Sequence, residues 1–397
     1  MNIFRPQTPY TFRPPRYSRP LAPLLAKVSE IFYLRKKFHT RAVTVEGVES
    51  VAKLVKHGHS LLIAPNHSDH ADPHVLMKIS RRHGLRFHFM AAREGFESSR
   101  LNAFVLQRCG AFSIDREGAD VSAIKTAIQI LQDGSFPLVI FPEGEIYHHQ
   151  ARLDPLNEGV ATIVLRATNR LAEQHRSYLV PTTLKYSHDQ AVQRSFSARL
   201  DALERRITWK PRGSMDAVER IYRLGGGLLA IKEVEFLGQV QEGDLIERIA
   251  NLRNRLVEIV EQKHQQAGTG SIPERVKALR GRIRKHLTDA TADLSAQQQA
   301  DLYDDLDTLF MVVQLYSYPG QYLREDPGID RIAETILKLE EDVLDEAKYP
   351  APRDVHVHFD EPIDVKAFLS EHSLNAKSGV GPLTALLSNS IQATLER

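Results

Sequence analysis

The sequence NHSDHADP at residues 66–73 is the stretch around which the chain is organised. It follows the apolar run LLIAP at residues 61–65, which is typical of a buried strand, and it precedes a helix-like segment. A histidine at a strand end with a carboxylate five positions later suits general-base chemistry, because the unperturbed imidazole pKa lies near ~6.5. In this interpretation His67 accepts a proton and Asp72 holds its other ring nitrogen. The alternative is a surface turn in which Asp69 or Asp72 caps the helix.

The composition is that of a globular protein with more than one structural unit. Its 397 residues are 42% hydrophobic and 26% charged. A net charge of +2 argues against a dedicated nucleic-acid binder. The single cysteine, Cys109, excludes an internal disulfide and fits a reducing compartment. No run approaches the ~18 apolar residues that span a bilayer, so we expect any membrane contact to be peripheral.

The first 40 residues depart from this balance of charge. They carry eight lysines and arginines against one acid, Glu30. Residues 1–20 are rich in proline and arginine and lack the apolar segment of a signal peptide, so we expect an irregular arm. Residues 21–37 place large apolar side chains at helical spacing and end in three basic residues. This segment is either an amphipathic helix at a membrane interface or a helix packed on the core.

Between residues 42 and 184, strand and helix patterns alternate. Strands are expected at residues 42–46, 60–65, 87–92, 111–114, 137–141 and 177–184. Helices are expected at residues 48–56, 73–82, 99–107, 121–132 and 158–173. The alternation predicts an α/β fold with a layered, mostly parallel sheet flanked by helices. In such sheets, ligands bind beyond the carboxyl ends of the strands.

Two further polar clusters follow predicted strands. Asp115 and Arg116 come after the strand at residues 111–114, where an arginine could grip a phosphate with its planar fork. Glu143 and Gly144 follow the next strand, and the glycine would let main-chain N–H groups approach an anion. Taken separately, the first cluster could be a surface ion pair and the second an ordinary turn. Three polar clusters at successive strand ends indicate a common site.

The order and spacing of these clusters resemble the glycerolipid acyltransferase superfamily, of the 1-acylglycerol-3-phosphate acyltransferase type. The resemblance covers roughly residues 40–200. His67 and Asp72 match the His-x4-Asp signature. The second and third blocks are matched by Gly110, Phe112, Asp115, Arg116, Phe141, Pro142, Glu143 and Gly144, and the proline-containing strand of the fourth by Val180 and Pro181.

This resemblance implies an enzyme that moves a fatty acyl group from acyl-CoA or acyl carrier protein to the hydroxyl of a lysophospholipid. The expected acceptor is 1-acylglycerol-3-phosphate, and the reaction requires no metal or cofactor. His67 and Asp72 would be catalytic. Substrate-binding roles would fall to Asn66, Gly110, Asp115, Arg116, Glu143 and Gly144. The expected location is cytoplasmic and peripheral at the membrane.

The third block departs from the family's pattern, which is usually Phe-Pro-Glu-Gly-Thr-Arg. Glu145 and Ile146 stand where threonine and arginine are usual. The departure removes a positive charge and adds a negative one. Either Glu145 points away from the acceptor, or the head of the acceptor carries a cation. The retained Arg116 favours a phosphate-bearing acceptor.

Two other functions remain open at this point. His67, His70 and His74 could form the ligand cluster of a metal-dependent hydrolase. That interpretation leaves the later motifs unexplained and lacks the two-histidine helix of zinc proteases. The other alternative is a catalytically silent lipid-binding protein on the same fold.

Beyond residue 200, helical patterns dominate. Helices are predicted at residues 216–230, 243–265, 273–287, 295–316 and 329–347, with the triple glycine at residues 225–227 interrupting the first. The basic cluster at residues 275–286 is either a solvated helix face or a surface that meets phosphate or membrane. Residues 354–359 alternate as a strand that resembles the closing strand of the acyltransferase domain, and a last helix is expected at residues 382–395.

The predicted organisation therefore has four parts. They are a basic arm with an amphipathic helix at residues 1–40, the α/β domain at 41–212, a helical insertion at 213–350, and a closing strand with a C-terminal helix at 351–397.

Overall fold

The computed structural model describes residues 10–116, 120–266, 268–289, 293–318, 320–350 and 352–397. The chain divides into two compact units. One unit comprises Thr11–Asp189 and Tyr349–Arg397, and the other contains Gln190–Lys348. The part of the expected N-terminal arm at residues 1–9 lies outside the described residues.

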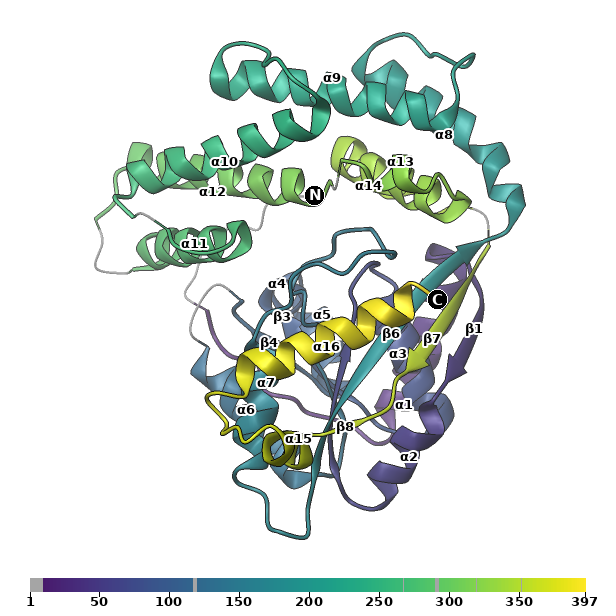
Figure 1. Ribbon diagram of the computed structural model, residues 1–397, viewed down its shortest axis with the longest axis vertical. Coiled ribbons are helices and arrows are strands. Elements are labelled where there is room, and N and C mark those ends of the chain that lie inside the picture. The colour runs from purple at the N-terminus through teal and green to yellow at the C-terminus, as the bar shows by residue number, and fades with distance from the viewer. Residues whose placement is uncertain (1–9, 117–119, 267, 290–292, 319, 351) are drawn as a thin grey trace. The chain divides into compact units, whose positions relative to one another are not determined.

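The first unit is built on an eight-stranded sheet (Figure 1). Its strands are β1 (Thr40–Glu46), β2 (Ser60–Pro65), β3 (His88–Ala92), β4 (Ala111–Ile114), β5 (Leu138–Val139), β6 (Ser177–His188), β7 (Arg353–Phe359) and β8 (Ile363–Asp364). They follow the order β1-β7-β6-β2-β5-β3-β4, with β8 also paired to β6. The five strands from β6 to β4 are mutually parallel, whereas β7 is antiparallel to β6. This mostly parallel sheet confirms the predicted fold class.

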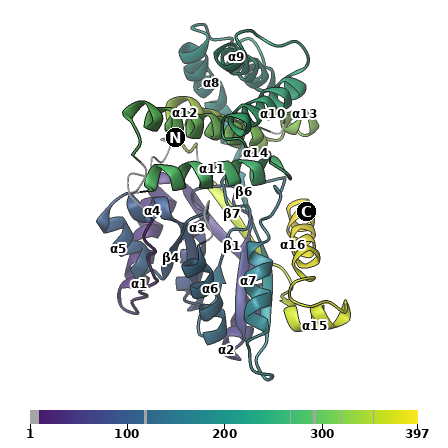
Figure 2. The same cartoon turned by 90° about the vertical axis from the view of Figure 1, so that its left-hand side faces the viewer.

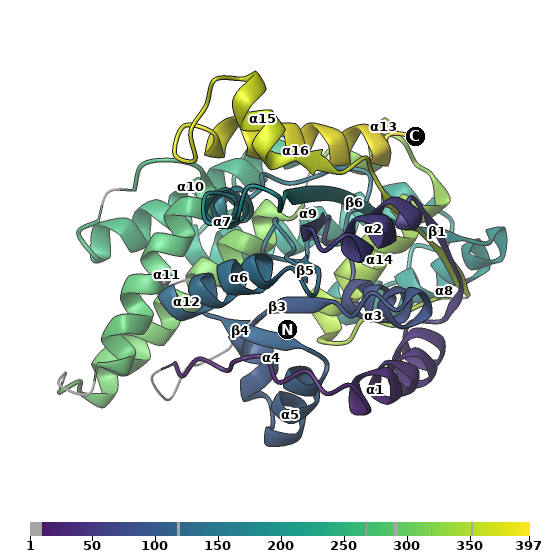
Figure 3. The ribbon, with the colours of Figure 1, turned by 90° about the horizontal axis from the view of Figure 1, so that it is seen from below.

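Helices cover both faces of the sheet (Figures 2 and 3). The helices before β6 are α1 (Leu21–Ser29), the π-helix η1 (Glu30–Lys37), α2 (Val48–Lys56), α3 (Asp72–His83), α4 (Arg93–Glu97), α5 (Arg100–Arg108), α6 (Val121–Asp133) and α7 (Gly159–Thr168). After β7 come α15 (Val365–Glu371) and α16 (Val380–Leu395). Leu62 and Ala64 of β2 pack with α6, α7 and α16, because alternate residues of a strand face opposite sides of its sheet. On the other side lies α3, with α1 packed against it.

The α1 and η1 helices are fixed to α3 by a buried carboxylate. Glu30 is 2% exposed and forms an ion pair with Arg81 at 2.8 Å and with Lys78 at 3.4 Å. Burial alone would raise the pKa of Glu30, but these neighbouring cations lower it below its ordinary value. The large apolar side chains Leu24 and Phe32 lie on the exposed side of the same segment.

The strand predicted near the C-terminus returns to the sheet after the second unit. Residues 353–359 form β7, which pairs with both β6 and β1. Its buried residues Val355, Val357 and Phe359 alternate with more exposed ones, as expected for a strand. The segment between β6 and β7 is therefore inserted into the order of a single sheet.

The second unit is helical (Figure 1). It contains the 3-10 turn η2 (Gln190–Val192) and α8 (Gln193–Ile207), α9 (Ala217–Leu237), α10 (Leu245–Lys263), α11 (Ile272–Thr288), α12 (Ala296–Tyr316), α13 (Tyr322–Glu325) and α14 (Ile329–Leu344). One core joins α9 to α10, α11 and α12, and another joins it to α8 and α14. The unit starts at Gln190, before residue 213, where the helical insertion was expected.

The predicted interruption at residues 225–227 is wrong. Helix α9 continues through the three glycines to Leu237. Leu224 before them and Leu229 after them are both buried in packed helical cores. This tertiary packing outweighs the roughly 1 kcal/mol by which each glycine disfavours a helix.

Candidate active site

The strand ends collect most of the expected site residues at one edge of the sheet. His67 follows β2, Asp115 and Arg116 follow β4, and Glu143 lies in the loop after β5. These strands are parallel, so their carboxyl ends share an edge. The α/β topology therefore creates a composite polar site from segments that are up to 76 residues apart in sequence.

His67 and Asp72 form a hydrogen-bonded pair in this site. The Nδ1 atom of His67 lies 2.9 Å from Oδ2 of Asp72. Asp72 is fully buried at the start of α3, whereas the His67 side chain is 14% exposed. The imidazole ring stacks on Phe141 at a centroid distance of 4.0 Å. Since a carboxylate accepts the proton on Nδ1, Nε2 is the ring nitrogen that can take a proton from a substrate.

A tyrosine that sequence reasoning missed completes the environment of Asp72. The hydroxyl of Tyr186 donates to Oδ1 of Asp72 at 2.5 Å, and the main-chain N–H of Asp69 donates to Oδ2 at 3.0 Å. Gln150 bonds both the main-chain N–H and the C=O of Tyr186, which fixes the tyrosine on β6. The carboxylate thus has three donors, which hold it in one orientation toward His67.

The loop between β2 and α3 is anchored by a buried ion pair. The guanidinium of Arg353, at the start of β7, binds the carboxylate of Asp69 with contacts of 2.6 and 2.9 Å. Arg353 also donates to the main-chain oxygen of Phe38 and lies over the rings of Tyr186 and Tyr349. Burial alone would raise the pKa of Asp69, but Arg353 lowers it below its ordinary value. No motif in the sequence links these two residues, which are 284 positions apart.

Glu143 contacts the loop that carries His67 through its carboxyl group. Its Oε1 accepts the main-chain N–H of His67 at 2.6 Å, and its Oε2 accepts that of Asp154 at 3.3 Å. Burial raises the pKa of Glu143 to about 8, and the negative charge of Asp154 adds to this increase. Asp154 is itself bonded to His149 at 2.6 Å, with both side chains buried. This geometry supports a positioning role for Glu143 toward His67.

The raised pKa of Glu143 predicts a specific pH dependence of folding stability. The folded protein keeps a proton on Glu143 that the unfolded chain loses near its ordinary pKa of 4.5. The stabilisation is therefore complete below that pH and is lost as the pH rises toward about 8. The Tm of wild type should fall more between pH 5 and pH 8.5 than the Tm of Glu143→Gln. Glu46→Gln, an exposed control, should follow wild type, and parallel curves for wild type and Glu143→Gln would contradict the prediction.

Arg116 and Gly144 also meet at this edge. The guanidinium of Arg116 donates to the main-chain oxygen of Gly144 and lies 3.1 Å from the carboxylate of Glu145. Gly144 has φ +79°, and a Cβ there would lie 2.9 Å from the side chain of Asn157. Asp115 lies 3.5 Å from the guanidinium of Arg93.

Two other expected substrate-binding residues lie elsewhere or are engaged by the main chain. Gly110 precedes β4, so it lies at the opposite edge of the sheet from His67. Its φ of +91° and its closeness to the oxygen of Phe87 account for a glycine there. The side-chain amide of Asn66 bonds both the N–H and the C=O of Leu184, which extends the pairing of β2 with β6.

The three histidines considered as metal ligands have different environments. His67 is held by Asp72. His74 bonds Ser29 through Nδ1 at 2.7 Å and stacks on Tyr33. Burial lowers the pKa of His74 to about 4, and its surroundings are those of a packed core histidine. The ring of His70 packs edge-on against that of His148.

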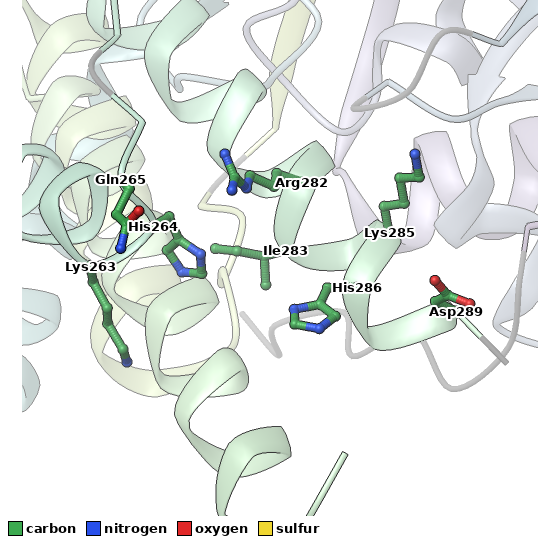
Figure 4. A pocket seen from close by; sticks show the side chains of 8 residues that line it. All are labelled: Lys263, His264, Gln265, Arg282, Ile283, Lys285, His286 and Asp289. Carbon is green, nitrogen blue, oxygen red and sulfur yellow. The ribbon is translucent and has the colours of Figure 1, made fainter. Parts of the chain in front are cut away.

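A separate pocket lies in the helical unit (Figure 4). Its volume is about 520 Å³, and its lining includes Lys263 and His264 near the end of α10 and Arg282, Lys285 and His286 on α11. Lys263 and His264 each lie 2.8 Å from the carboxylate of Asp305. The basic lining favours an anionic group, and none of the expected site residues belongs to this pocket.

A mostly parallel sheet with an ordered histidine–carboxylate pair at a strand end is an arrangement that α/β enzymes use for general-base chemistry. Comparison with known proteins shows what this domain is similar to. The Acyltransferase family model matches residues 42–185, which contain the His67 pair, Arg116 and Glu143. Residues 42–185 therefore carry a domain that matches the Acyltransferase family.

Two curated relatives match part of this domain. The chain is 34% identical over 125 residues to a 1-acyl-sn-glycerol-3-phosphate acyltransferase of Streptococcus pneumoniae (strain ATCC BAA-255 / R6), covering 32% of this chain and 43% of the relative. It is 36% identical over 78 residues to a 1-acyl-sn-glycerol-3-phosphate acyltransferase of Bacillus subtilis (strain 168), covering 20% and 37%. The matches thus span less than half the length of each relative.

Proposed function

We propose that this protein is an O-acyltransferase that moves a fatty acyl group from a thioester to the free hydroxyl of a lysophospholipid. The observation that carries the proposal is the His67–Asp72 pair, with its 2.9 Å contact at the carboxyl end of β2. The two relatives named for 1-acyl-sn-glycerol-3-phosphate support a lysophospholipid as the acceptor class. The donor is a thioester of coenzyme A or of acyl carrier protein.

In the proposed reaction, the acceptor hydroxyl attacks the thioester carbonyl while Nε2 of His67 takes its proton. Asp72 holds Nδ1 and stabilises the imidazolium that forms, and Tyr186 and the Asp69 N–H keep Asp72 in place. Collapse of the tetrahedral intermediate forms the new ester and breaks the carbon–sulfur bond. The thiolate leaves with the proton that His67 returns. No enzyme nucleophile takes part, so the acyl group passes directly to the acceptor.

The test of this function is thiol release with purified full-length protein. Acyl-CoA and acyl carrier protein thioesters are supplied separately, each with a series of lysophospholipids. The proposal expects thiol release only when an acceptor is present, with an equal amount of diacyl product by mass spectrometry. Thiol release without acceptor would instead indicate a hydrolase. Binding of lysolipid without thiol release from either donor would favour a catalytically silent lipid-binding protein.

We also propose that the first unit meets the membrane surface through α1, η1 and α5. Exposed apolar side chains gather here: Leu24, Val28 and Phe32 on the first two helices, and Leu101 and Phe104 on α5. Helices α1 and α5 contact each other, and Figure 2 shows them side by side. Lys36 lies over Phe32 and Arg108 over Phe104, so cationic groups border the apolar surface. This combination suits the interface of an anionic bilayer.

Within the described residues, no helix has both the length and the apolar character needed to cross a bilayer.

Replacing Leu24, Phe32 and Leu101 together with serine should reduce binding to anionic vesicles by about tenfold or more. Complete removal of a large apolar side chain from water contributes roughly 1.5–3 kcal/mol to the free energy of binding. A side chain in a shallow membrane interface is only partly removed from water, so it contributes part of this energy. Co-flotation with vesicles containing phosphatidylglycerol measures the effect, and wild-type binding should weaken as salt is increased. The control variant, Val121→Ser with Leu386→Ser, removes exposed apolar side chains from α6 and α16 and should bind like wild type. Equal flotation of both variants would contradict this surface assignment.

A further inference from the structure

The loop after β5 connects the catalytic histidine to Arg116. Glu143 accepts the main-chain N–H of His67, and the next residue, Gly144, accepts a hydrogen bond from Arg116. When the hydroxyl of a lysolipid lies at His67, its headgroup would therefore lie near Arg116 and Glu145. The two side chains are 33% and 34% exposed, so both are accessible to a ligand.

Carboxylates surround the guanidinium groups in this region. Arg116 lies 3.1 Å from Glu145 and 3.7 Å from Glu94. The neighbouring Arg93 similarly lies between two carboxylates, Glu97 at 3.0 Å and Asp115 at 3.5 Å. Among these described side chains, the carboxylates outnumber the arginines by two. This surplus of negative charge disfavours the binding of a dianion. The guanidinium of Arg116 can still bind a phosphate oxygen.

We propose that Glu145 determines headgroup specificity and adapts the acceptor site to a zwitterionic lysolipid. The anionic phosphodiester of such a headgroup lies against Arg116, and its ammonium group lies against Glu145. The two charges of the headgroup are then each next to a protein charge of opposite sign. A phosphate monoester carries two negative charges and no cation, so nothing in the ligand offsets its repulsion by the Glu145 carboxylate.

This inference rests on the proposed acyl transfer to a lysophospholipid and narrows its acceptor class. A binding measurement tests the headgroup inference separately from the proposed acyl transfer, because headgroup preference is measurable without turnover. Short-chain lysophosphatidylethanolamine and lysophosphatidate, which stay monomeric, are titrated into full-length protein by isothermal calorimetry. Thiol release with one fixed thioester donor is then measured for the same two acceptors.

The informative variant is Glu145→Gln, which keeps the shape of the side chain and removes its charge. We expect wild type to bind the ethanolamine lysolipid more tightly. In the variant, the ratio of the two affinities should shift toward lysophosphatidate by about 5- to 50-fold, as expected for one partly exposed charge near the ligand. The ratio of kcat/KM values should shift in the same direction. Glu46→Gln is the matched control, because it removes an exposed glutamate charge that pairs with His358 on the edge strand β1.

A wild-type preference for lysophosphatidate that Glu145→Gln leaves unchanged would overturn the headgroup inference, whatever the turnover assay shows. Conversely, the expected shift in binding without thiol release from any donor would support the headgroup inference and overturn the proposed acyl transfer. If Glu46→Gln shifted the ratio as much as Glu145→Gln, the effect would reflect the general field of the protein, and the assignment to Glu145 would be wrong.

Discussion

Replacing His67 with alanine is expected to lower the rate of acyl transfer by about 10²–10⁴-fold, because the acceptor hydroxyl loses its general base. The fold should persist, since the His67 side chain is partly exposed and Asp72 keeps its bonds from Tyr186 and from the N–H of Asp69. Thiol release under saturating donor measures the loss, and thermal unfolding measures the fold. A variant with wild-type turnover would remove His67 from the mechanism.

Asp72→Asn should lower the rate of acyl transfer by a similar factor, for a different reason. The amide oxygen is expected at the position of Oδ2, where it accepts from the N–H of Asp69 and from Nδ1 of His67, and the amide nitrogen then faces the hydroxyl of Tyr186, which can accept. The neutral amide lacks the negative charge that stabilises the imidazolium formed during proton transfer, so turnover falls. The control His57→Ala removes a histidine whose ring bonds a main-chain oxygen at the end of α2, and it should leave turnover unchanged. Full activity in Asp72→Asn would contradict the assigned role of the carboxylate.

Replacing Arg353 with methionine should be the most destabilising of the changes considered for the first unit. It leaves the buried carboxylate of Asp69 without its cation, and loss of one partner from a buried ion pair typically costs about 3–5 kcal/mol. Activity should fall as well, because the main-chain oxygen of Asp69 accepts the N–H of Asp72 and the same loop carries His67. Urea denaturation of the full chain measures the change in stability.

Two further variants separate charge burial from packing. The double variant Asp69→Asn with Arg353→Met removes both charges, and it should recover much of the stability lost in Arg353→Met alone. Arg41→Met breaks a half-exposed pair with Asp354 and should change stability by less than about 1 kcal/mol. If Arg353→Met were no more destabilising than Arg41→Met, the buried pair would not anchor the loop that carries His67.

The sequence alone determined the α/β class, because strand and helix periodicities depend on local side-chain spacing. The runs at residues 60–65 and 111–114 form β2 and β4 with the predicted bounds. The His67–Asp72 pair was also predictable, since the two residues are five positions apart at a strand-to-helix junction. Likewise, the parallel arrangement implied that Arg116 and Glu143 would share an edge with His67.

Local patterns could not show how these side chains are used. Glu143 was expected to bind substrate, and the structure shows its carboxyl group in contact with the main-chain N–H groups of His67 and Asp154. The sequence left open whether Glu145 points away from the acceptor or faces a cationic headgroup, and in the structure its carboxylate lies 3.1 Å from Arg116. Both outcomes depend on how the loops after different strands meet, which no single segment encodes.

The tertiary structure alone decided which residues support the His67–Asp72 pair from far away in the sequence. Tyr186 reaches Asp72 from β6, and Arg353 reaches Asp69 because β7 runs antiparallel to β6 and starts at the carboxyl edge of the parallel strands. In the sequence, both residues lie just outside the predicted strands at residues 177–184 and 354–359, and nothing in the local pattern marks them. Hydrogen bonds and buried charges act over a few ångströms in space, and the insertion of a whole helical unit between β6 and β7 separates those contacts along the chain.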